Sequence, residues 1–295
     1  MDIRSVTADS TATYPLSPSQ LQFYRDNGYL VIKRLISIPA LNSYRQRFTD
    51  VCEGRVEKGR VTVIKDRSLS RRQTKPEDYI NKIQELLYDD VYSTYSEDPR
   101  LLHIVTQLIG EDITAVNCML INKPPGTSEH PPHQDLLYFP FRPADKILAT
   151  WTAIDPVSRD NGCLYMMPGS HKTDVLYEHG DQDNEAKLFF YGIVNSGDVA
   201  PEQRRVYLEM DPGDTVFFQS SIVHGSRPNI SKIYRKAMTC HYANSSCRYI
   251  EVYGTRQDGL AKQMEAELRR RGSDLTYVDL WRIKTKQVRG VRSNL

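Results

Sequence analysis

The 295-residue sequence has few cysteines, and they form no recognisable pattern. There are five, scattered along the chain without a C-x-x-C spacing, so we expect free thiols in a reducing compartment rather than a disulfide framework. A continuous run of about 18 apolar residues is also missing, which argues against a membrane-spanning helix. Residues 1–19 lack an apolar core, so a signal peptide is not expected either.

A strong net charge is lacking as well. The 39 lysines and arginines nearly balance the 37 aspartates and glutamates, which leaves a formal net charge of +2 at pH 7. Proteins that bind nucleic acids usually carry a basic surface over much of a domain. Nucleic acid is therefore not an expected partner, and recognition of any anion must come from a local cluster of cations.

The part of the sequence that precedes residue 113 predicts mainly helices. Residues 1–15 are polar and predict a flexible tail. Ser17 then provides an N-cap, Pro18 occupies the first helical position and Gln20 completes a capping box, so a helix should run from there to Gly28. The other elements expected in this part are a strand at 29–32, a helix at about 39–52 and a helical region that ends near residue 110.

From about residue 113 the sequence changes to short β-rich runs. Turn signals such as Pro124–Pro125–Gly126 separate these runs, a pattern that is typical of a sandwich or barrel. The expected strands lie at 114–122, 147–154, 163–167, 206–210, 214–219 and 236–242. We predict one domain, 16–295, that is mainly β with a helical layer. Its core, at about 113–245, should be a double-stranded β-helix (a cupin-like jelly roll), with a C-terminal helix near 260–272.

Two polar segments each fit two interpretations. Residues 54–78 carry eight lysines and arginines, and they form either an exposed loop or a rim that receives an anionic substrate. Residues 174–205 interrupt the pattern of strands with a long insert, which in a compact fold is usually a lid or a disordered loop. The sequence does not separate these alternatives.

The stretch His130-Pro131-Pro132-His133-Gln134-Asp135 contains a candidate metal-binding pair. Residues two apart in an extended segment point to the same side, so His133 and Asp135 can face a single ion. Far downstream, His224 supplies a third candidate ligand within a His-Gly-Ser sequence. Two histidines and one carboxylate leave metal positions open, an arrangement that suits Fe(II) oxygenases.

Arg235 lies 11 residues after His224 (235 − 224), in the apparent strand 235–243. Its guanidinium can grip a carboxylate at two points, which a 2-oxoglutarate co-substrate requires once its keto-acid end is on the metal. Residues 237, 239 and 241 share its face, and the first two are small enough to leave room for a co-substrate. An H-x-D pair is common by chance, whereas its combination with a distant H-G-S and this arginine is much more specific.

The other histidines have ordinary interpretations. His130 and His133 stand at H-x-x-H spacing, but the two prolines between them exclude a regular helix, so we interpret His130 as structural. No other candidate ligand stands at a suitable spacing from His103, His171 or His179, and these three are expected to be surface or core residues.

Motifs along most of the chain resemble the phytanoyl-CoA dioxygenase family of Fe(II)/2-oxoglutarate oxygenases. They are HQDLLYFPFRP at 133–143, NGCL at 161–164, PGSHK at 168–172, GDTVFF at 213–218, HGS at 224–226 and RKA at 235–237. The resemblance implies hydroxylation at C-2 of a 3-methyl-branched fatty acyl-CoA, a reaction of fatty-acid alpha-oxidation. It also implies use of Fe(II), 2-oxoglutarate and O2, release of succinate and CO2, and ascorbate as a supporting reductant.

The resemblance further implies a set of site residues. The metal ligands would be His133, Asp135 and His224. The contacts of 2-oxoglutarate would be Lys82, Met119, Trp151, Ser226 and Arg235. Trp151 also fits a plain core aromatic, and Lys82 is indicated by the resemblance alone.

Three other functions fit the same residues. The chain can be an oxygenase of this class that acts on another small molecule, or a hydrolytic zinc enzyme, which would not need Arg235. It can also be a non-enzymatic jelly-roll protein that binds a metal. For an acyl-CoA substrate, the candidate phosphate contacts are the basic segment 55–75, Arg142 and Lys172.

The C-terminal Ser293–Asn294–Leu295 resembles the S-K-L peroxisomal signal but lacks its lysine. It indicates a peroxisomal import receptor as a partner and a peroxisomal location; without it, a cytoplasmic location is expected.

Overall fold

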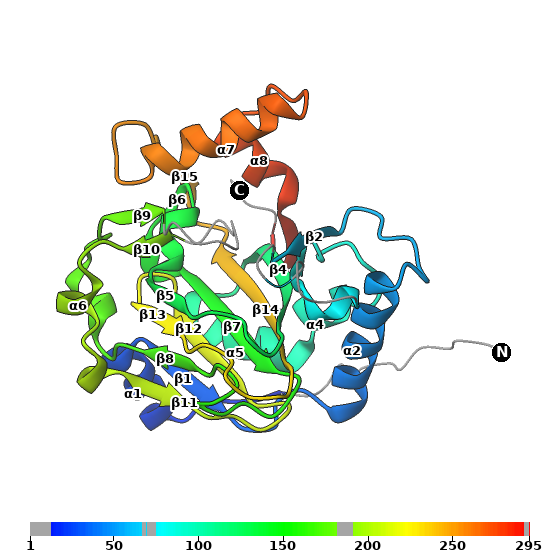
Figure 1. Ribbon diagram of the computed structural model, residues 1–295. Helices are drawn as coiled ribbons and strands as arrows, with labels where there is room; N and C mark the ends of the chain where they lie inside the picture. Colours follow the sequence, from blue (N-terminus) through cyan, green and yellow to red (C-terminus); the bar gives the residue numbers. More distant parts are fainter. Residues whose placement is uncertain (1–12, 67–68, 70–74, 182–190, 292–294) are drawn as a thin grey trace.

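The computed structural model describes residues 13–66, 69, 75–181, 191–291 and 295 of the chain (Figure 1). Helix α1 (Pro18–Asn27) begins at the predicted capping box: the Ser17 hydroxyl accepts from the Gln20 N–H, and the Gln20 side chain accepts from the Ser17 N–H. It ends at Gly28, whose φ of 80° favours glycine. The predicted first helix is confirmed.

Helices α2 (Ile38–Cys52) and α5 (Pro99–Ile109) form the helical layer. Each begins at a capping side chain, Ser37 for α2 and Asp98 for α5, which accepts backbone N–H groups of the first turn. Their apolar faces share one hydrophobic core with residues of the main sheet. Between them in sequence lie a short 3-10 helix (Pro76–Asp78) and the one-turn helix α4 (Ser93–Ser96).

An antiparallel sheet crosses the centre of the fold. Its order is β1-β12-β7-β14-β4-β3-β2, and β16 also pairs with β4. The strands are β1 (Tyr29–Ile32), β2 (Thr62–Lys65), β3 (Ile80–Gln84), β4 (Ile113–Lys123), β7 (Ile147–Ala153), β12 (Thr215–Gln219), β14 (Arg235–Asn244) and β16 (Lys286–Arg289). The strand predicted at 29–32 is β1. The six strands predicted from residue 113 onward match β4, β7, β12 and β14, together with β8 (Leu164–Met166) and β11 (Val206–Leu208), within a few residues.

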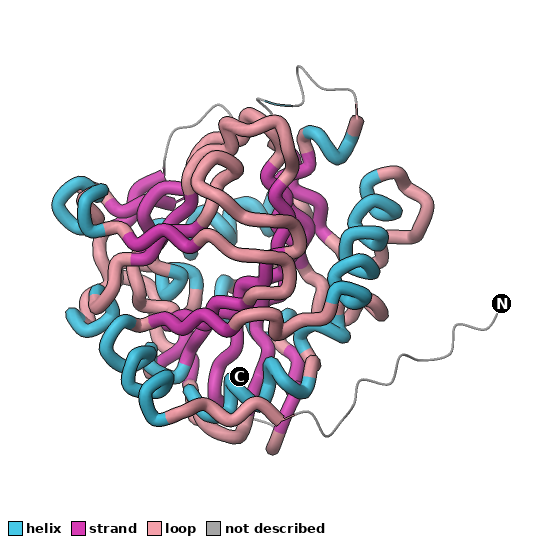
Figure 2. The backbone as a smooth tube through the Cα atoms, turned by 90° about the horizontal axis from the view of Figure 1, so that it is seen from below, coloured by secondary structure: helices cyan, strands magenta, loops and turns pink. Residues whose placement is uncertain are grey.

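A second, smaller antiparallel sheet faces the first. Its order is β11-β8-β13-β5, and its strands are β5 (His130–His133), β8 (Leu164–Met166), β11 (Val206–Leu208) and β13 (His224–Ser226). Trp151 and Phe218 from the main sheet pack in one cluster with Leu164 and Met166 from the second, so the two sheets enclose a common interior. This is the predicted jelly roll. Figure 2 shows its strands at the centre of the molecule, with helices around them.

The insert at 174–205 contains regular structure near both of its ends. Strands β9 (His179–Asp181) and β10 (Tyr191–Ile193) pair antiparallel, and helix α6 (Ser196–Val199) follows. Residues 182–190, in the middle of the insert, lie outside the described residues. The choice between a lid and a disordered loop therefore stays a prediction.

The predicted C-terminal helix is α7 (Asp258–Arg270), and helix α8 (Tyr277–Lys284) follows it before β16. Figure 1 shows α7 and α8 at one end of the sheets.

The remaining short elements are β6 (Phe141–Arg142), β15 (Arg248–Tyr249) and 3-10 turns at Asp135–Tyr138, Ala144–Lys146, Ser170–Thr173 and Glu202–Arg204. Among the described residues, no helix combines the length and the apolar character that a membrane crossing needs.

The segment before α1 is attached to α5. The Tyr14 N–H donates to His103 Nδ1, and the Leu16 N–H donates to Gln107 Oε1. Residues 1–12 of the predicted tail lie outside the described residues.

Candidate active site

The three candidate metal ligands come together because β5 and β13 are paired neighbours. His133 stands directly opposite His224 in this pairing, and Asp135 follows at the start of a 3-10 turn. Asp135 Oδ1 lies 3.4 Å from His133 Nε2, and its Oδ2 lies 3.7 Å from His224 Nε2. One ligand atom from each residue falls within 4.8 Å of the others, and all three residues are buried. This spacing can hold one metal ion.

Backbone carbonyl groups orient both imidazoles. His133 Nδ1 lies 2.9 Å from the carbonyl oxygen of Pro131, and His224 Nδ1 lies 3.1 Å from that of Ile222. Because a carbonyl oxygen can only accept, each Nδ1 carries the hydrogen and each Nε2 keeps its lone pair for the site.

The charges of the site are those that metal binding requires. Burial lowers the pKa of His224 to about 4, so this ring is neutral near pH 7. Burial alone would raise the pKa of Asp135, but the neighbouring His224 and His241 hold it well below its usual range. The neutral His224 imidazole and the ionised Asp135 carboxylate, together with the imidazole of His133, form a nitrogen and oxygen donor set that fits Fe(II).

His241 is a site residue that the sequence analysis did not assign. It lies on β14, is buried, and its Nε2 donates to Asp135 Oδ2 over 2.9 Å. This bond fixes the orientation of the candidate carboxylate ligand. A signal was present in the sequence, because 241 shares the face of the strand on which Arg235 lies.

Gln134, between two of the candidate ligands, is also firmly held. Its backbone N–H donates to His179 Nε2 over 3.1 Å, and its side-chain amide donates to the carbonyl groups of Val175 and Ser221. His179, expected to be an ordinary surface or core residue, therefore supports the segment that carries the triad.

All eight residues assigned from the sequence line one cavity of about 110 Å³. They are Lys82, Met119, His133, Asp135, Trp151, His224, Ser226 and Arg235. Burial lowers the pKa of Lys82 to about 8. Cross-strand pairing explains the convergence: Met119 of β4 and Trp151 of β7 both stand opposite Thr239 of β14.

The end of this cavity that Arg235 occupies is polar and positively charged. Arg235 Nη2 donates to the Gly162 carbonyl over 2.9 Å, its guanidinium carbon lies 5.2 Å from the centre of the Trp151 ring, and its Nε has no partner among the described residues. Burial lowers the pKa of Arg235 to about 10. Lys123, which the sequence analysis missed, donates from Nζ to the Ser226 hydroxyl over 2.8 Å. These groups can receive a carboxylate.

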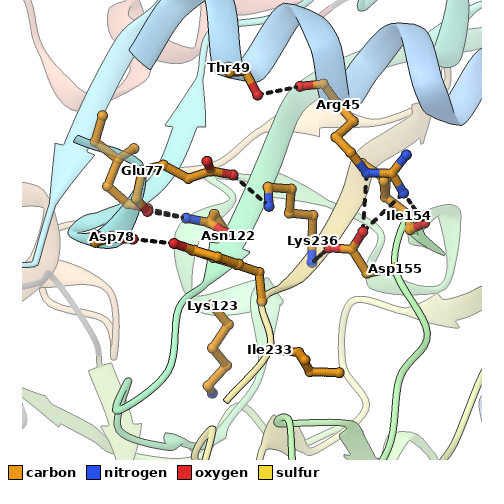
Figure 3. Close-up of polar contacts among 12 residues, drawn as sticks. Arg45, Thr49, Glu77, Asp78, Asn122, Lys123, Ile154, Asp155, Ile233 and Lys236 are labelled. Carbon is orange, nitrogen blue, oxygen red and sulfur yellow. Dashed lines mark hydrogen bonds and ion pairs between the residues drawn. The ribbon is translucent and has the colours of Figure 1, made fainter. Parts of the chain in front are cut away.

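A buried network on the opposite face of β4 and β14 fixes their register. Lys236 Nζ lies 2.8 Å from Glu77, and the Lys236 N–H donates to Asp155. Asn122 donates to the backbone carbonyls of Glu77 and Ile80. Figure 3 shows Lys123 pointing away from this network. Strand alternation therefore places Asn122 and Lys236 toward the helices, and Lys123 and Arg235 toward the cavity.

A second cavity of about 190 Å³ shares His133 and Asp135 of the metal triad with the first, and two C-terminal helices provide much of its apolar wall. The two cavities have Lys82, Met119, His130, His133, Asp135 and His241 in common. The wall of the second comes largely from Leu260 and Met264 of α7 and from Tyr277, Leu280 and Trp281 of α8. His130, interpreted as structural, stacks on His133 with ring centres 4.0 Å apart.

The cations proposed for phosphate recognition have different surroundings. Arg142 donates to the carbonyls of Phe139 and Phe141, and Lys172 pairs with Asp26 of α1, so both serve local structure. In the basic segment, Arg55 pairs with Asp50 and Glu53, while Arg67, Arg71 and Arg72 lie outside the described residues.

Arg60, from the same basic segment, is placed differently. It lines a third cavity of about 310 Å³ together with Lys284 and Tyr88, and Lys284 also lines the apolar cavity. Lys284 pairs with Glu85 over 2.6 Å.

Comparisons with known proteins agree with this geometry. A family model described as phytanoyl-CoA dioxygenase (PhyH) matches residues 24–237. A probable phytanoyl-CoA dioxygenase of Caenorhabditis elegans is 42% identical over 300 residues, 95% of this chain and 95% of the relative. The peroxisomal phytanoyl-CoA dioxygenase of Homo sapiens is 37% identical over 289 residues, 95% of this chain and 85% of the relative.

Solved structures share the fold. The alpha-ketoglutarate-dependent carbocyclase SnoK from nogalamycin biosynthesis has a TM-score of 0.60 at 23% identity, over 84% of this chain and 90% of that one. EvdO2 from Micromonospora carbonacea, complexed with 2-oxoglutarate, has a TM-score of 0.60 at 18% identity, over 81% and 95% of the two chains. On the family match and the two relatives, the chain belongs to the phytanoyl-CoA dioxygenase family of Fe(II)- and 2-oxoglutarate-dependent oxygenases and is an enzyme of that family.

Proposed function

We propose that the chain hydroxylates C-2 of a 3-methyl-branched fatty acyl-CoA, with 2-oxoglutarate and O2 consumed and succinate and CO2 released. This is a reaction of fatty-acid alpha-oxidation. The names of the C. elegans and human relatives, both phytanoyl-CoA dioxygenases, support this substrate class. We assign residues 16–295 to a single oxygenase domain with its jelly-roll core at about 113–245.

The site residues follow the same assignment. His133, Asp135 and His224 hold Fe(II), and 2-oxoglutarate is contacted by Lys82, Met119, Trp151, Ser226 and Arg235. When bound, the iron and 2-oxoglutarate supply the oxidising chemistry. The residues of the chain bind and orient: Arg235 and the Ser226 hydroxyl receive the far carboxylate, and His241 holds Asp135 in place.

One observation carries the proposal: a cavity with a cationic end and a cavity with an apolar helical wall meet at His133 and Asp135 of the metal triad. A dicarboxylic co-substrate fits the cationic end, and an acyl chain fits the wall made by α7 and α8. A zinc hydrolase binds no 2-oxoglutarate, so its mechanism would not explain the buried Arg235 or the cationic end of the cavity.

The size of the apolar cavity limits what it receives. Its volume of about 190 Å³ is slightly larger than the roughly 150 Å³ of a protein cavity that takes up benzene. It therefore accommodates on the order of seven carbon atoms. We infer that it takes the segment of the acyl chain nearest the thioester, including C-2 and the methyl branch, and that the rest extends beyond it.

The CoA phosphates need cations near the opening of the apolar cavity. Arg60 and Lys284 share the neighbouring cavity, and Lys284 borders both cavities. Arg60 is the stronger candidate of the two, because Lys284 is already paired with Glu85. We assign Arg60 and Lys284 to CoA recognition. Of the basic segment 55–75, only Arg60 is therefore proposed as a phosphate contact.

A peroxisomal location is supported by the mammalian relatives whose names include it. Ser293–Asn294–Leu295 remains the proposed contact of an import receptor. Residues 293 and 294 lie outside the described residues, so this proposal rests on the sequence.

The proposed reaction is tested by product analysis. The iron-loaded protein is incubated with 2-oxoglutarate and one of three acyl substrates: a 3-methyl-branched acyl-CoA, an unbranched acyl-CoA of equal length and the branched free acid. Mass spectrometry should find a 2-hydroxyacyl-CoA from the branched thioester, formed in equal amount with succinate, and the His224→Ala variant should form neither. If succinate formation responds to a different small molecule and to none of these substrates, the acyl-CoA assignment is wrong.

A further inference from the structure

Two basic side chains are buried at the polar end of the cavity, and no carboxylate of the described residues lies within ion-pair distance of either. Lys123 and Arg235 are each at most 4% exposed. Their hydrogen bonds within the described residues go to neutral groups, the Ser226 hydroxyl and the Gly162 carbonyl. Burial and the neighbouring Arg235 lower the pKa of Lys123 well below its usual range, and Glu129 and Asp155 act on the two side chains only from a distance. Burying a cation without a counter-charge is costly, so this arrangement points to an anionic ligand.

The pairing of the strands sharpens this point. Lys123 on β4 stands directly opposite Arg235 on β14 in the antiparallel ladder. Directly opposed side chains of like charge destabilise a sheet. Stability alone would therefore not favour a lysine at this position, whereas a ligand that carries a carboxylate would benefit from both cations.

Gly162 contacts both Lys123 and Arg235. Its φ is +93°, and a Cβ built on it would lie 2.7 Å from Cδ and 3.0 Å from Cε of Lys123. The carbonyl of this glycine accepts the bond from Arg235. Because Gly162 has no side chain, it leaves space for the aliphatic part of Lys123, while its carbonyl accepts the hydrogen bond from Arg235.

We propose that Lys123 supplies the second positive charge of the subsite for the far carboxylate of the co-substrate. This inference rests on the proposed function and extends it by one binding residue. Since Lys123 donates to the Ser226 oxygen, the hydroxyl hydrogen of Ser226 is free to point toward the same carboxylate. The subsite therefore selects 2-oxo acids that have a second carboxylate over those that end in a methyl group.

The test measures binding rather than turnover. Calorimetry on protein loaded with redox-inert Mn(II) compares 2-oxoglutarate with 2-oxopentanoate, which has the same keto-acid head and chain length but no far carboxylate. Lys123→Met keeps most of the stem beside Gly162 and removes the ammonium group. Lys65→Met, at the exposed end of β2, is the control for the loss of one positive charge.

Lys123→Met should weaken 2-oxoglutarate binding by about ten- to a hundredfold, the usual loss for a contact to a charged group. It should change 2-oxopentanoate binding much less, and Lys65→Met should bind both as the unmodified chain does. If Lys123→Met does not fold, Lys123→Gln, which keeps a hydrogen-bond donor, takes its place with the same expectation.

Unchanged 2-oxoglutarate binding in the lysine variant overturns the inference, and so does an equal loss for both ligands, because Lys123 would then act on the fold. Neither result affects the proposed function. If the unmodified chain does not bind 2-oxoglutarate at all, the proposed function fails and the role of Lys123 fails with it.

Discussion

His241 shows how one neighbour sets the orientation of a candidate metal ligand. Its Nε2 holds Asp135 Oδ2 at 2.9 Å, on the side of the carboxylate that faces β14. Without this bond the carboxylate can rotate away from His133 and His224. Residues that orient a ligand in this way typically change metal affinity by about 10- to 100-fold when they are replaced.

We therefore expect His241→Ala to weaken Mn(II) or Fe(II) binding by about 10- to 100-fold while the fold persists. The measurement is a metal titration followed by electron paramagnetic resonance or calorimetry. His103→Ala is the control, because His103 accepts from the Tyr14 N–H at the far side of α5. Equal metal affinity in both variants would show that Asp135 does not depend on His241.

At the scale of single residues, local patterns predicted the candidate metal ligands and Arg235, whereas Lys82 and Met119 were indicated by the family resemblance alone. The H-x-D spacing, the distant H-G-S and the arginine on the next strand are all read from short stretches, and the structure brings them to one cavity. Lys123 was missed because its importance comes from its pairing with Arg235, more than a hundred residues away. Strand registers of that separation are not encoded in any short motif.

Among the elements, β14 connects the site to the helical layer. Its cavity face carries Arg235, and its other face carries Lys236, which is bound to Glu77 and lies 4.4 Å from the centre of the Tyr234 ring. Because a shift of one residue would exchange the two faces, the buried Lys236–Glu77 pair protects the position of Arg235.

Glu77→Gln should lower the free energy of unfolding by about 2 kcal/mol or more, because it leaves the Lys236 ammonium buried without a counter-charge. The carboxylate is partly exposed, which keeps the expected loss below that of a fully buried pair. Glu178→Gln, which removes an exposed pair with Arg256, should cost less than about 1 kcal/mol. Urea unfolding curves compare the two variants; equal losses would contradict a special role for the buried pair.

Helices α7 and α8 form much of the apolar wall, so a change there should affect the acyl substrate and spare the co-substrate. Met264→Trp is expected to fill part of the 190 Å³ cavity and to lower turnover of a branched acyl-CoA at least about tenfold. The affinity for 2-oxoglutarate should stay the same. Met264→Leu keeps the volume and should behave like the unmodified chain.

Initial rates over a series of acyl-CoA concentrations, with 2-oxoglutarate affinity measured separately, distinguish the outcomes. Unchanged acyl-CoA turnover by the tryptophan variant would remove the apolar cavity from the acyl site. Loss of 2-oxoglutarate binding would indicate instead that the substitution disturbs the metal centre.

The elements differed in how far the sequence predicted them. Helix α1 carries its capping box and its terminal glycine within a dozen residues, so its bounds were predicted correctly. Helix α8 and strand β16 were not predicted. The strand has the sequence KQVR, without apolar alternation, and it forms because the edge of β4 offers hydrogen-bond partners. A strand of this kind forms only when tertiary structure places a partner strand beside it, so its sequence alone does not reveal it.

Over the whole molecule, a net charge of +2 gives little attraction for CoA, which carries several phosphates. Binding must therefore depend on the local cations Arg60 and Lys284. The apparent affinity for a branched acyl-CoA should weaken as salt rises, since ions screen these contacts over about 8–10 Å at physiological strength. The free acid should be turned over less well and with little dependence on salt.

Arg60→Ala should raise the KM for the acyl-CoA severalfold and reduce its salt dependence. Lys172→Ala removes a cation that is paired with Asp26 of α1, and it should leave both the KM and its salt dependence unchanged. Initial rates across a salt series test this. Equal use of the free acid with no salt dependence would remove CoA from the assignment and leave the iron and 2-oxoglutarate chemistry in place.

The measurement that bears most directly on the site is an anaerobic titration of the metal-free protein with Fe(II) and then 2-oxoglutarate, followed by visible absorption. If His133, Asp135 and His224 hold iron and Arg235 receives the far carboxylate of 2-oxoglutarate, a metal-to-ligand charge-transfer band should grow to one equivalent of each. Arg235→Lys should need about tenfold or more 2-oxoglutarate for the same band, because the two-point contact is lost. His224→Ala should show no band. A full band in the His224→Ala variant, or no band in the unmodified protein, would contradict the site.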